Sequence, residues 1–231
     1  MYLFDVHTHT AEVSPCGRLT AEQSVAHYVE MGYAGICVTD HFNINVIKKR
    51  GGVTWEEKVD NYLRGYRLAK AAGEKMGLTV LFGMEVQPNE VGQIYDSYNE
   101  YLVYGLQPQF LYDNPYLYDY SVEALALKVH ENGGMIFQAH PFRRHMVRVA
   151  MHVLDGIEAY NGNPRHNSSN DLAIATAKAN HWGMVSGSDS HQTEDGGHGG
   201  LMLWNHPKTE QELVAELKAN KYALICSTEK F

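Results

Sequence analysis

The alternation of short apolar runs with amphipathic segments constrains the fold of this chain most strongly. The runs are rich in β-branched residues and are flanked by glycine, which favours strands over buried helices. They occupy residues 2–6, 34–39, 79–83, 101–104, 135–139, 156–159, 184–186 and 222–225. Helical periodicity marks residues 21–31, 55–76, 122–132, 169–180 and 210–220. Such alternation predicts successive parallel βα units.

The number of units decides between the two common parallel architectures. Seven or eight units over residues 1–231, with no Pro- or Ser-rich linker between them, indicate a single domain. A doubly wound sheet would more often carry a glycine-rich first turn, whereas here the first turn carries His7 and His9. We therefore expect a single α/β domain folded as a distorted (β/α)7 TIM-like barrel.

Charge and cysteine content exclude several classes of partner. The net charge is −8, and the longest basic run is Lys48-Lys49-Arg50, so an extended nucleic-acid surface is not expected. Cys16, Cys37 and Cys226 form no CxxC pair, which indicates neither disulfides nor a thiolate zinc finger and is typical of the reducing cytoplasm. The chain has no run of about 20 apolar residues, so no membrane span is predicted. The oligomeric state is left open.

Imidazole and carboxylate groups gather where the predicted strands end. Since the carboxyl ends of barrel strands converge on one face, residues that follow different strands become neighbours. The candidates are His7 and His9, Asp40 and His41, Glu85, His140, and Asp189 with His191. Each alone has an ordinary interpretation as a capping, turn or surface residue. Together they would place uncompensated charge at one mouth, which a metal centre explains directly.

The ligand types indicate which metals are expected. Imidazole and carboxylate without a thiolate cluster suit zinc, manganese or iron. Seven candidate ligands exceed the needs of one ion: His7, His9, His41, Glu85, His140, Asp189 and His191. Two or three divalent ions are therefore predicted, and a pair about 3.5–4 Å apart is suited to phosphoryl transfer through a bridging hydroxide.

At this point the sequence resembles the PHP family, named for polymerase and histidinol phosphatase domains. The motifs run in the family's order over residues 1 to about 200: His7-x-His9, Thr39-Asp40-His41, Glu85, Ala139-His140-Pro141 and Gly187-Ser188-Asp189-Ser190-His191. The resemblance implies a distorted (β/α)7 barrel with phosphoesterase activity. It also implies that His7, His9, Glu85 and Asp189 hold one ion with Glu85 bridging, and that His41, His140 and His191 serve neighbouring ions.

The sequence departs from the family pattern in two places. Many members carry a further His or Asp shortly after HxH, where this chain has Glu12, Ser14 and Cys16. Many also carry a histidine near the fourth strand, where residues 101–105 contain none. Glu12 is either a substitute oxygen ligand or a solvated loop residue, and the sequence leaves both open.

The remaining candidates concern a small anionic phosphate-ester substrate. Arg143 and Arg165 both follow strands, and each is either a phosphate ligand or a surface arginine. Asp189 or His191 is the candidate general acid for the leaving alkoxide when not engaged as a ligand. His198, among four glycines, is a candidate for a substrate loop, and the tyrosine-rich residues 95–120 either stack on a substrate or form an irregular rim.

Two other functions compete with phosphate-ester hydrolysis. A metal-dependent amidohydrolase also opens with HxH, but normally uses a metal-bridging lysine near mid-barrel, and no lysine ends a predicted strand here. The second alternative is a barrel that binds metal or a partner without turnover. Ligand motifs near both ends of the chain favour retained chemistry.

Overall fold

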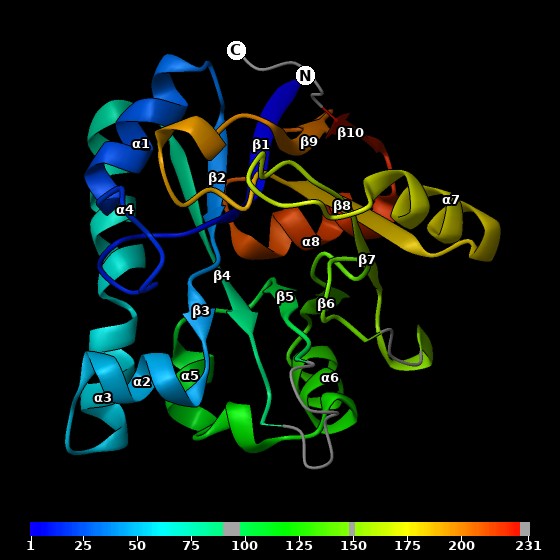
Figure 1. Ribbon diagram of the computed structural model, residues 1–231. Helices are drawn as coiled ribbons and strands as arrows, with labels where there is room; N and C mark the ends of the chain where they lie inside the picture. Colours follow the sequence, from blue (N-terminus) through cyan, green and yellow to red (C-terminus); the bar gives the residue numbers. More distant parts are fainter. Residues whose placement is uncertain (90–97, 148–150, 227–231) are drawn as a thin grey trace.

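The computed structural model describes residues 1–89, 98–147 and 151–226 (Figure 1). The strands in this part of the chain are β1 (Tyr2–Thr8), β2 (Gly35–Val38), β3 (His41–Phe42), β4 (Thr79–Val86), β5 (Tyr101–Tyr104), β6 (Met135–Gln138), β7 (Gly156–Asn161), β8 (Gly183–Gly187), β9 (Gly199–Leu203) and β10 (Tyr222–Cys226). The α-helices are α1 (Ala21–Glu30), α2 (Ile44–Arg50), α3 (Trp55–Tyr62), α4 (Arg64–Met76), α5 (Gln109–Asp113), α6 (Val122–Glu131), α7 (Asn170–Asn180) and α8 (Glu210–Ala219). Short 3-10 turns are η1 (Leu117–Asp119), η2 (Met151–Val153) and η3 (Thr193–Asp195).

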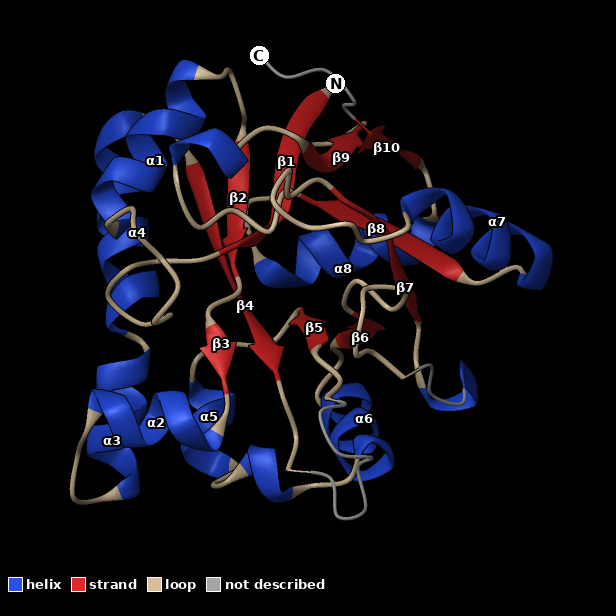
Figure 2. Cartoon of the chain, viewed as in Figure 1, coloured by secondary structure: helices blue, strands red, loops and turns tan. Residues whose placement is uncertain are grey.

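The strands form one mixed sheet that curls into a nearly closed barrel, with helices around it (Figure 2). Their order is β10-β9-β1-β2-β4-β5-β6-β7-β8, with β3 beside β4. An isolated bridge between Thr8, the last residue of β1, and Ser190, after β8, brings the first and last strands of the barrel wall together. The distorted barrel expected from the sequence is confirmed, with seven strands from β1 to β8 in the wall when β3 is counted with β2.

Not all strand pairs are parallel, which corrects the expectation of uniform βα units. β5 is antiparallel to both β4 and β6, and β9 is antiparallel to β1 and β10. Because β5 is antiparallel to β4, it begins at the face where β4 ends. Residues that precede β5 therefore lie at the carboxyl face of its neighbours.

The barrel interior is apolar at one end and polar at the other. Phe4, Tyr104 and Phe137 are fully or almost fully buried within the wall, and α8 adds Leu213 and Leu217 to the same cluster. Val214 of α8 also packs so close to Gly105 that a side chain there would collide with it. Helix α8 thus closes the amino end of the barrel, which leaves the carboxyl end for polar groups.

The predicted helix over residues 55–76 is divided in two at Leu63. Just after this break, an added Cβ at Gly65 would lie 2.1 Å from Oγ1 of Thr10 and 2.8 Å from Oδ2 of Asp40. The hydroxyl of Tyr62 donates a hydrogen bond to the Asp40 carbonyl at 2.7 Å. The break and the glycine thus let the helix pair approach the loops that carry the candidate site.

No helix in the described residues is long and apolar enough to span a membrane.

Candidate metal centre

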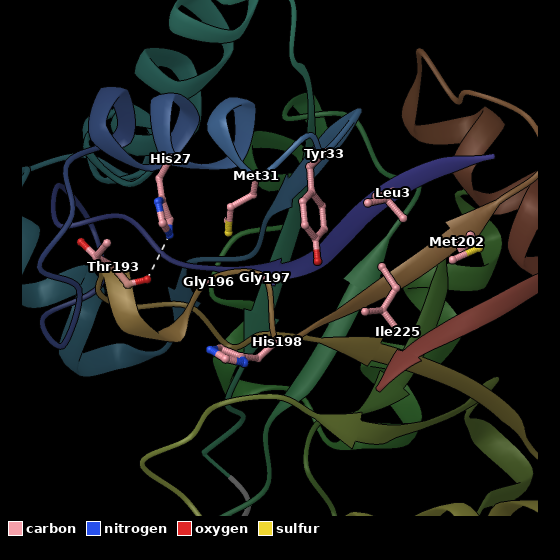
Figure 3. A pocket seen from close by; sticks show the side chains of 10 residues that line it. All are labelled: Leu3, His27, Met31, Tyr33, Thr193, Gly196, Gly197, His198, Met202 and Ile225. Carbon is pink, nitrogen blue, oxygen red and sulfur yellow. Dashed lines mark hydrogen bonds between the residues drawn. The ribbon is translucent and has the colours of Figure 1, made fainter. Parts of the chain in front are cut away.

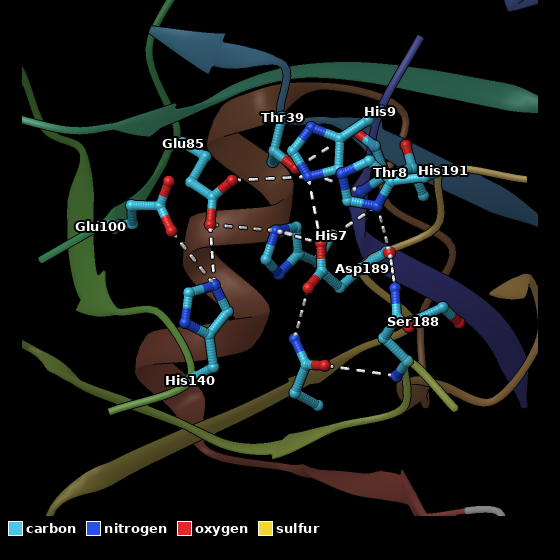
Figure 4. Close-up of polar contacts among 12 residues, drawn as sticks. His7, Thr8, His9, Thr39, Glu85, Glu100, His140, Ser188, Asp189 and His191 are labelled. Carbon is cyan, nitrogen blue, oxygen red and sulfur yellow. Dashed lines mark hydrogen bonds and ion pairs between the residues drawn. The ribbon is translucent and has the colours of Figure 1, made fainter. Parts of the chain in front are cut away.

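The seven predicted metal ligands converge at the carboxyl end of the barrel, and Figure 4 labels all of them except His41. They come from β1 and the residue after it, from β3, from β4, and from the loops after β6 and β8. All except His41 are buried, and the His41 side chain is 17 % exposed. The structure therefore brings together every ligand that the sequence predicted.

Glu85 lies at the middle of the cluster and faces four imidazoles. Its Oε1 is 3.3 Å from Nε2 of His7 and 3.1 Å from Nε2 of His140. Its Oε2 is 3.4 Å from Nε2 of His9 and 2.7 Å from Nδ1 of His41. Each carboxylate oxygen thus faces a different pair of histidines.

Hydrogen bonds donated by Nδ1 fix the tautomers of three histidines. Nδ1 of His7 must donate to the Glu158 carboxylate at 2.8 Å, and Nδ1 of His191 must donate to the Asp189 carbonyl at 2.8 Å. Ser14 donates its own proton to Asp40, so Nδ1 of His9 donates to the Ser14 hydroxyl at 3.1 Å. In each neutral ring Nε2 is left as a lone pair, as a metal ligand requires.

Two of the candidates sit on strained backbone. His140 and Asp189 have φ values of 27° and 51°, in the left-handed region that residues other than glycine seldom adopt. The amide of His140 donates to Glu158 at 2.9 Å, and Asn163 donates to the Asp189 carbonyl at 2.8 Å. Surrounding hydrogen bonds therefore hold both side chains in the cluster against local strain.

The charges of the cluster perturb its own titration. Burial lowers the pKa of His7, but the charges of Glu158, Asp189 and Glu85 outweigh it and raise the pKa well above its ordinary value. Burial also lowers the pKa of His9, and nearby His191 and His41 lower it further. The site thus holds positive charge at some rings and excludes it from others, as buried acid–base clusters at functional sites do.

Two acidic residues of the cluster were missed by the sequence analysis. Glu100 precedes β5, and its carboxylate is 3.5 Å from Nδ1 of His41 and 3.6 Å from Nε2 of His140. Burial, together with the charge of Glu85, raises the pKa of Glu100 to about 7. Glu158 lies within β7 and is buried. A search restricted to residues after strands could find neither, but a glutamate inside an apolar strand is a usable signal.

The loop between β1 and α1 is joined to Asp40, which lies between β2 and β3 next to His41, by hydrogen bonds from Thr10 and Ser14. Asp40 accepts hydrogen bonds from the Thr10 amide at 2.7 Å and from the Ser14 hydroxyl at 2.6 Å. The Glu12 carboxylate instead accepts from the Ala21 amide at the start of α1. Glu12 is thus engaged as a helix cap in this structure.

Cys16 lies in the same loop, near the imidazoles of His191 and His41. Desolvation raises the pKa of its thiol, but the contacts with these two imidazoles outweigh it and lower the pKa to about 6. The side chain is exposed. Cys16 is therefore a thiol of high thiolate content at the edge of the cluster.

The two predicted substrate arginines both contact carboxylates. Arg143 donates to Oδ2 of Asp189 at 2.8 Å and to Oδ1 of Asn161 at 2.9 Å, and its side chain is 17 % exposed. Arg165 forms two hydrogen bonds with Asp195, at 2.9 and 2.6 Å, and is 42 % exposed. Arg143 thus lies against a candidate ligand, whereas Arg165 lies further out.

A separate cavity of about 640 Å³ lies beside α1 (Figure 3). His198 lines it together with Met31 and Ile225, and no candidate metal ligand does. Two polar groups of its wall are paired, since the Tyr33 hydroxyl donates to the Gly199 carbonyl and His27 contacts the Thr193 carbonyl. The cavity is mainly apolar and distinct from the cluster, so the loop function expected for His198 stays a prediction.

The tyrosine-rich segment is partly described, because residues 95–97 lie outside the described residues. In the described part, Tyr116 and Tyr118 pack around Trp55, with ring centroids 4.7 and 6.4 Å away. These two tyrosines belong to an aromatic rim beside α3.

Unpartnered atoms test whether a metal fits the cluster. Nε2 of His7, Nε2 of His9, Nδ1 of His41 and Oε2 of Glu85 are buried without a hydrogen-bond partner. Nδ1 of His41 and Oε2 of Glu85 face each other at 2.7 Å, at the centre of the cluster. Buried polar atoms are almost always paired, so these groups fit divalent ions that would bind their lone pairs.

Comparison with known proteins identifies the family. The family model of the PHP domain matches residues 5–230. The chain belongs to the PHP domain family. A comparison with curated proteins found no significant match. This PHP chain departs from the family pattern in two places, after HxH and at residues 101–105. The structure places Cys16, from the first place, and Glu100, just before the second, beside the cluster.

Several solved structures share the fold of this PHP chain at low sequence identity. A two-domain protein from Bacteroides vulgatus, described as containing a predicted PHP-like metal-dependent phosphoesterase, has a TM-score of 0.68 and 18 % identity, covering 97 % of this chain and 64 % of its own. PsfC from Pseudomonas syringae has a TM-score of 0.69 and 14 % identity, covering 99 % and 93 %. An amidohydrolase from Chromobacterium violaceum, with bound sulfate and no metal, has a TM-score of 0.57 and 17 % identity, covering 81 % and 87 %. The chain thus spans less than two thirds of the Bacteroides protein.

Proposed function

We propose that this PHP chain hydrolyses a small phosphate ester with two or three bound divalent ions of zinc, manganese or iron. The observation that carries the proposal is the position of Glu85, whose two carboxylate oxygens face separate pairs of imidazoles. A single ion would leave one pair without a role. The ions would be held by His7, His9, His41, Glu85, His140, Asp189 and His191.

The protein groups would prepare the site for in-line attack. When bound, the ions would lower the pKa of a water molecule and neutralise charge on the phosphoryl oxygens. Glu158, Ser14 and the Asp189 carbonyl would keep three imidazole rings in the ligand tautomer. Glu85 would hold the two halves of the cluster at a fixed separation.

The two candidate acids differ in suitability. Burial raises the pKa of Asp189, but His7, His9 and Arg143 outweigh it and lower the pKa well below its ordinary value, so this carboxyl stays ionised and suits ligation. Burial lowers the pKa of His191, but Cys16 and Asp189 outweigh it and raise the pKa. His191 is therefore the better proton donor to a leaving alkoxide whenever it is not bound to an ion.

Arg143 is the stronger candidate for binding the substrate phosphate. Its guanidinium contacts Asp189 and therefore lies next to the proposed ions, while the more exposed Arg165 is paired with Asp195. A guanidinium has five donors, so Arg143 can hold Asp189 and still donate to a phosphate. The identity of the ester is not specified by these contacts. We retain the cytoplasm as the predicted location, since all three cysteines are free.

Amidohydrolysis is the second candidate, favoured by the structural likeness to the Chromobacterium protein. In this chain the central bridging position holds Glu85, and no lysine contacts the cluster among the described interactions. A barrel that binds metal without turnover is the third candidate.

The test begins with protein purified without chelator. Metal content would be counted by elemental analysis, and turnover of p-nitrophenyl phosphate and of an amide panel would be measured before and after chelation. The proposal predicts chelator-sensitive phosphate release that manganese or zinc restores, absent in Glu85→Gln and retained in the surface variant Glu131→Gln. Stoichiometric metal without turnover would favour the non-catalytic barrel, and amide turnover alone would favour the amidohydrolase.

A further inference from the structure

The side chain of Asn161 joins two carboxylates of the cluster. Asn161 is the last residue of β7 and is only 3 % exposed. Its Nδ2 donates to Oε2 of Glu158 at 3.0 Å and to Oδ2 of Asp189 at 3.2 Å. Both amide protons are therefore used, one on the carboxylate that accepts from His7 and the other on a proposed metal ligand.

An irregularity in β7 brings Asn161 and Glu158 to the same side of the strand. Residues three apart on a regular strand point to opposite faces of the sheet. The pairing of β7 with β8 shifts register between Glu158 and Tyr160, so that one extra residue of β7 reverses the alternation. Both side chains therefore reach the cluster, where they form a hydrogen bond with each other.

Neighbouring groups determine which way the Asn161 amide faces. Its Oδ1 accepts hydrogen bonds from Nη2 of Arg143 at 2.9 Å and from the Asn163 amide at 3.2 Å. A reversed amide would turn its NH₂ group toward these two donors and its oxygen toward two carboxylates. A carboxylate of the same shape would likewise meet Glu158 and Asp189 without a proton to share. The position therefore suits an amide.

The contacts of Asp189 divide its two oxygens between different partners. Oδ2 accepts from Arg143 at 2.8 Å as well as from Asn161. Oδ1 lies 3.5 Å from Nε2 of His7 and 3.3 Å from Nε2 of His9. The φ of Asp189 is 51°, a conformation that the surroundings must hold. The carboxylate is thus turned so that one oxygen faces the imidazoles of the cluster.

We propose that Asn161 is a positioning residue of the metal centre, whose amide holds Glu158 and Asp189 in the orientations that metal binding requires. Through Glu158 it secures the acceptor for Nδ1 of His7. Through Asp189 it keeps Oδ1 toward His7 and His9. One amide thus couples ligands of β1 with a ligand of the loop after β8. The inference rests on the metal centre of the proposed function but not on its reaction.

A variant of the same size separates this role from simple packing. Zinc affinity would be measured by chelator competition for wild-type protein, Asn161→Asp, Asn161→Ala and the control Asn167→Asp. Asn167 is exposed, and its Oδ1 accepts from the Ser169 amide at 3.0 Å, as an aspartate also can. Both Asn161 variants should lose about 10–100-fold in affinity, because both lack the two donors. The control should bind zinc like the wild-type protein.

The sign of the Asn161→Asp effect is decisive. If Asn161 only filled space, the aspartate would fit equally well, and its negative charge near the ions would leave zinc affinity equal or higher. A loss of affinity must therefore come from carboxylates that are no longer held in place.

Double variants test the connection to Glu158. Asn161→Ala and Glu158→Gln break one hydrogen-bond network, so their combined loss of affinity should be smaller than the product of the single losses by at least about twofold. Asn161→Ala with Glu131→Gln combines separate sites, and these effects should multiply. Multiplicative losses in both double variants would overturn the link to Glu158.

Nuclear magnetic resonance of the wild-type protein gives a readout that needs no variant. The two side-chain amide protons of Asn161 should exchange with solvent more slowly than those of the exposed Asn167, because both are buried and hydrogen-bonded. Adding zinc should shift the Asn161 signals, since Asp189 would then bind metal, and should leave the Asn167 signals in place.

The outcomes separate this inference from the proposed function. If wild-type protein binds zinc, but Asn161→Asp binds it equally well or more tightly, Asn161 does not position the ligands and the proposed function stands. If the variants do not fold, the wild-type spectrum decides, and Asn161 signals that do not respond to bound zinc overturn the inference alone. If wild-type protein binds no metal, the metal centre fails and both proposals fail with it.

Discussion

Replacing Glu158 by glutamine should weaken metal binding although Glu158 is not itself a proposed ligand. Its carboxylate accepts three hydrogen bonds: from Nδ1 of His7 at 2.8 Å, from the His140 amide at 2.9 Å and from Nδ2 of Asn161 at 3.0 Å. The first is made by Oε1 and the other two by Oε2. A glutamine has only one oxygen, so its amide group must face donors at one of these two positions.

The glutamine should adopt the orientation that loses fewer hydrogen bonds, and this orientation determines how metal affinity changes. Placing the NH₂ group at Oε2 opposes two donors, whereas placing it at Oε1 opposes only Nδ1 of His7. In the second orientation His7 is forced to move its proton to Nε2, the nitrogen that faces Glu85 and Asp189. A protonated Nε2 cannot bind metal. Outer-shell changes of this kind cost about 10–100-fold in metal affinity, equivalent to about 1.4–2.7 kcal/mol.

The assay is competition with a chelator of known affinity, for wild-type protein, Glu158→Gln and Glu131→Gln. Glu131 is a matched control because it forms an exposed ion pair with Lys128 on α6. We expect the control to bind metal like the wild-type protein. Equal affinity in Glu158→Gln, with the variant folded, would refute the argument that this carboxylate fixes the His7 tautomer.

Three further predictions follow from the burial and charge of the cluster. Burial, opposed by hydrogen bonds from Ser188 and Tyr28, raises the pKa of Asp5 from 3.8 to about 6, so the folded state binds the Asp5 proton more tightly than the unfolded state does. Protonated Asp5 therefore stabilises the fold fully below about pH 4, and this stabilisation is lost as the pH rises through about 6. The change in the free energy of unfolding is on the order of 3 kcal/mol. Urea unfolding of metal-free Asp5→Asn should therefore lack this part of the wild-type pH dependence, and parallel curves would contradict the assignment. Adding manganese or zinc at about 100 times its Kd should raise Tm by roughly 5–10 °C in calorimetry, because binding stabilises the folded state by about 2.7 kcal/mol. An unchanged Tm with metal shown to be bound would contradict this prediction. Glu100→Gln should lower the metal affinity, measured by chelator competition, at least about tenfold. It should also flatten the pH dependence of that affinity near pH 7, because the wild-type carboxyl must lose a proton near this pH to bind metal. An unchanged affinity would mean that Glu100 is not part of the metal centre.

The sequence was informative where local pattern determines structure. Periodicity predicted the seven wall strands and the major helices, because each element buries one face and is capped locally. The two strands that were missed lack such a pattern: β3 has only His41 and Phe42, and β9 begins with Gly199 and Gly200. Their pairing depends on neighbours distant in the sequence, Glu85 for β3 and Leu224 with Phe4 for β9.

The same distinction applies to the candidate site. All seven predicted ligands follow or end strands, so the rule that carboxyl ends converge was sufficient to find them. Glu100 was missed because strand direction is a long-range property: β5 runs opposite to its neighbours, and its amino end therefore faces the site. Glu158 was missed because it lies within β7 and not after it, and its partner His7 is 151 residues away, so only the glutamate within an apolar strand could have indicated it.

The closure of the barrel would make metal binding and local stability interdependent. β1 meets the loop after β8 at the Thr8–Ser190 bridge, where the His9 amide donates to the Ser190 carbonyl at 2.9 Å and the Ser190 amide donates to the His7 carbonyl at 3.3 Å. Candidate ligands lie on both sides of this seam, His7 and His9 on one side and Asp189 on the other. An ion held between them would have to be released before the seam opens, so its binding free energy would add to the free energy of opening.

Metal bound at this seam should protect particular amides from hydrogen exchange. At about 100 times Kd, exchange of the His9 and Ser190 amides should slow by up to about 100-fold if opening requires metal release. The amide of Tyr104, in the central β5–β6 pair with Met135, serves as the control and should change little, because that pair is closed by backbone bonds without the ion. Equal protection of all three amides would mean that metal stabilises the fold as a whole. Unchanged exchange at the seam, with metal shown to be bound, would mean that the ion does not join β1 to the loop after β8.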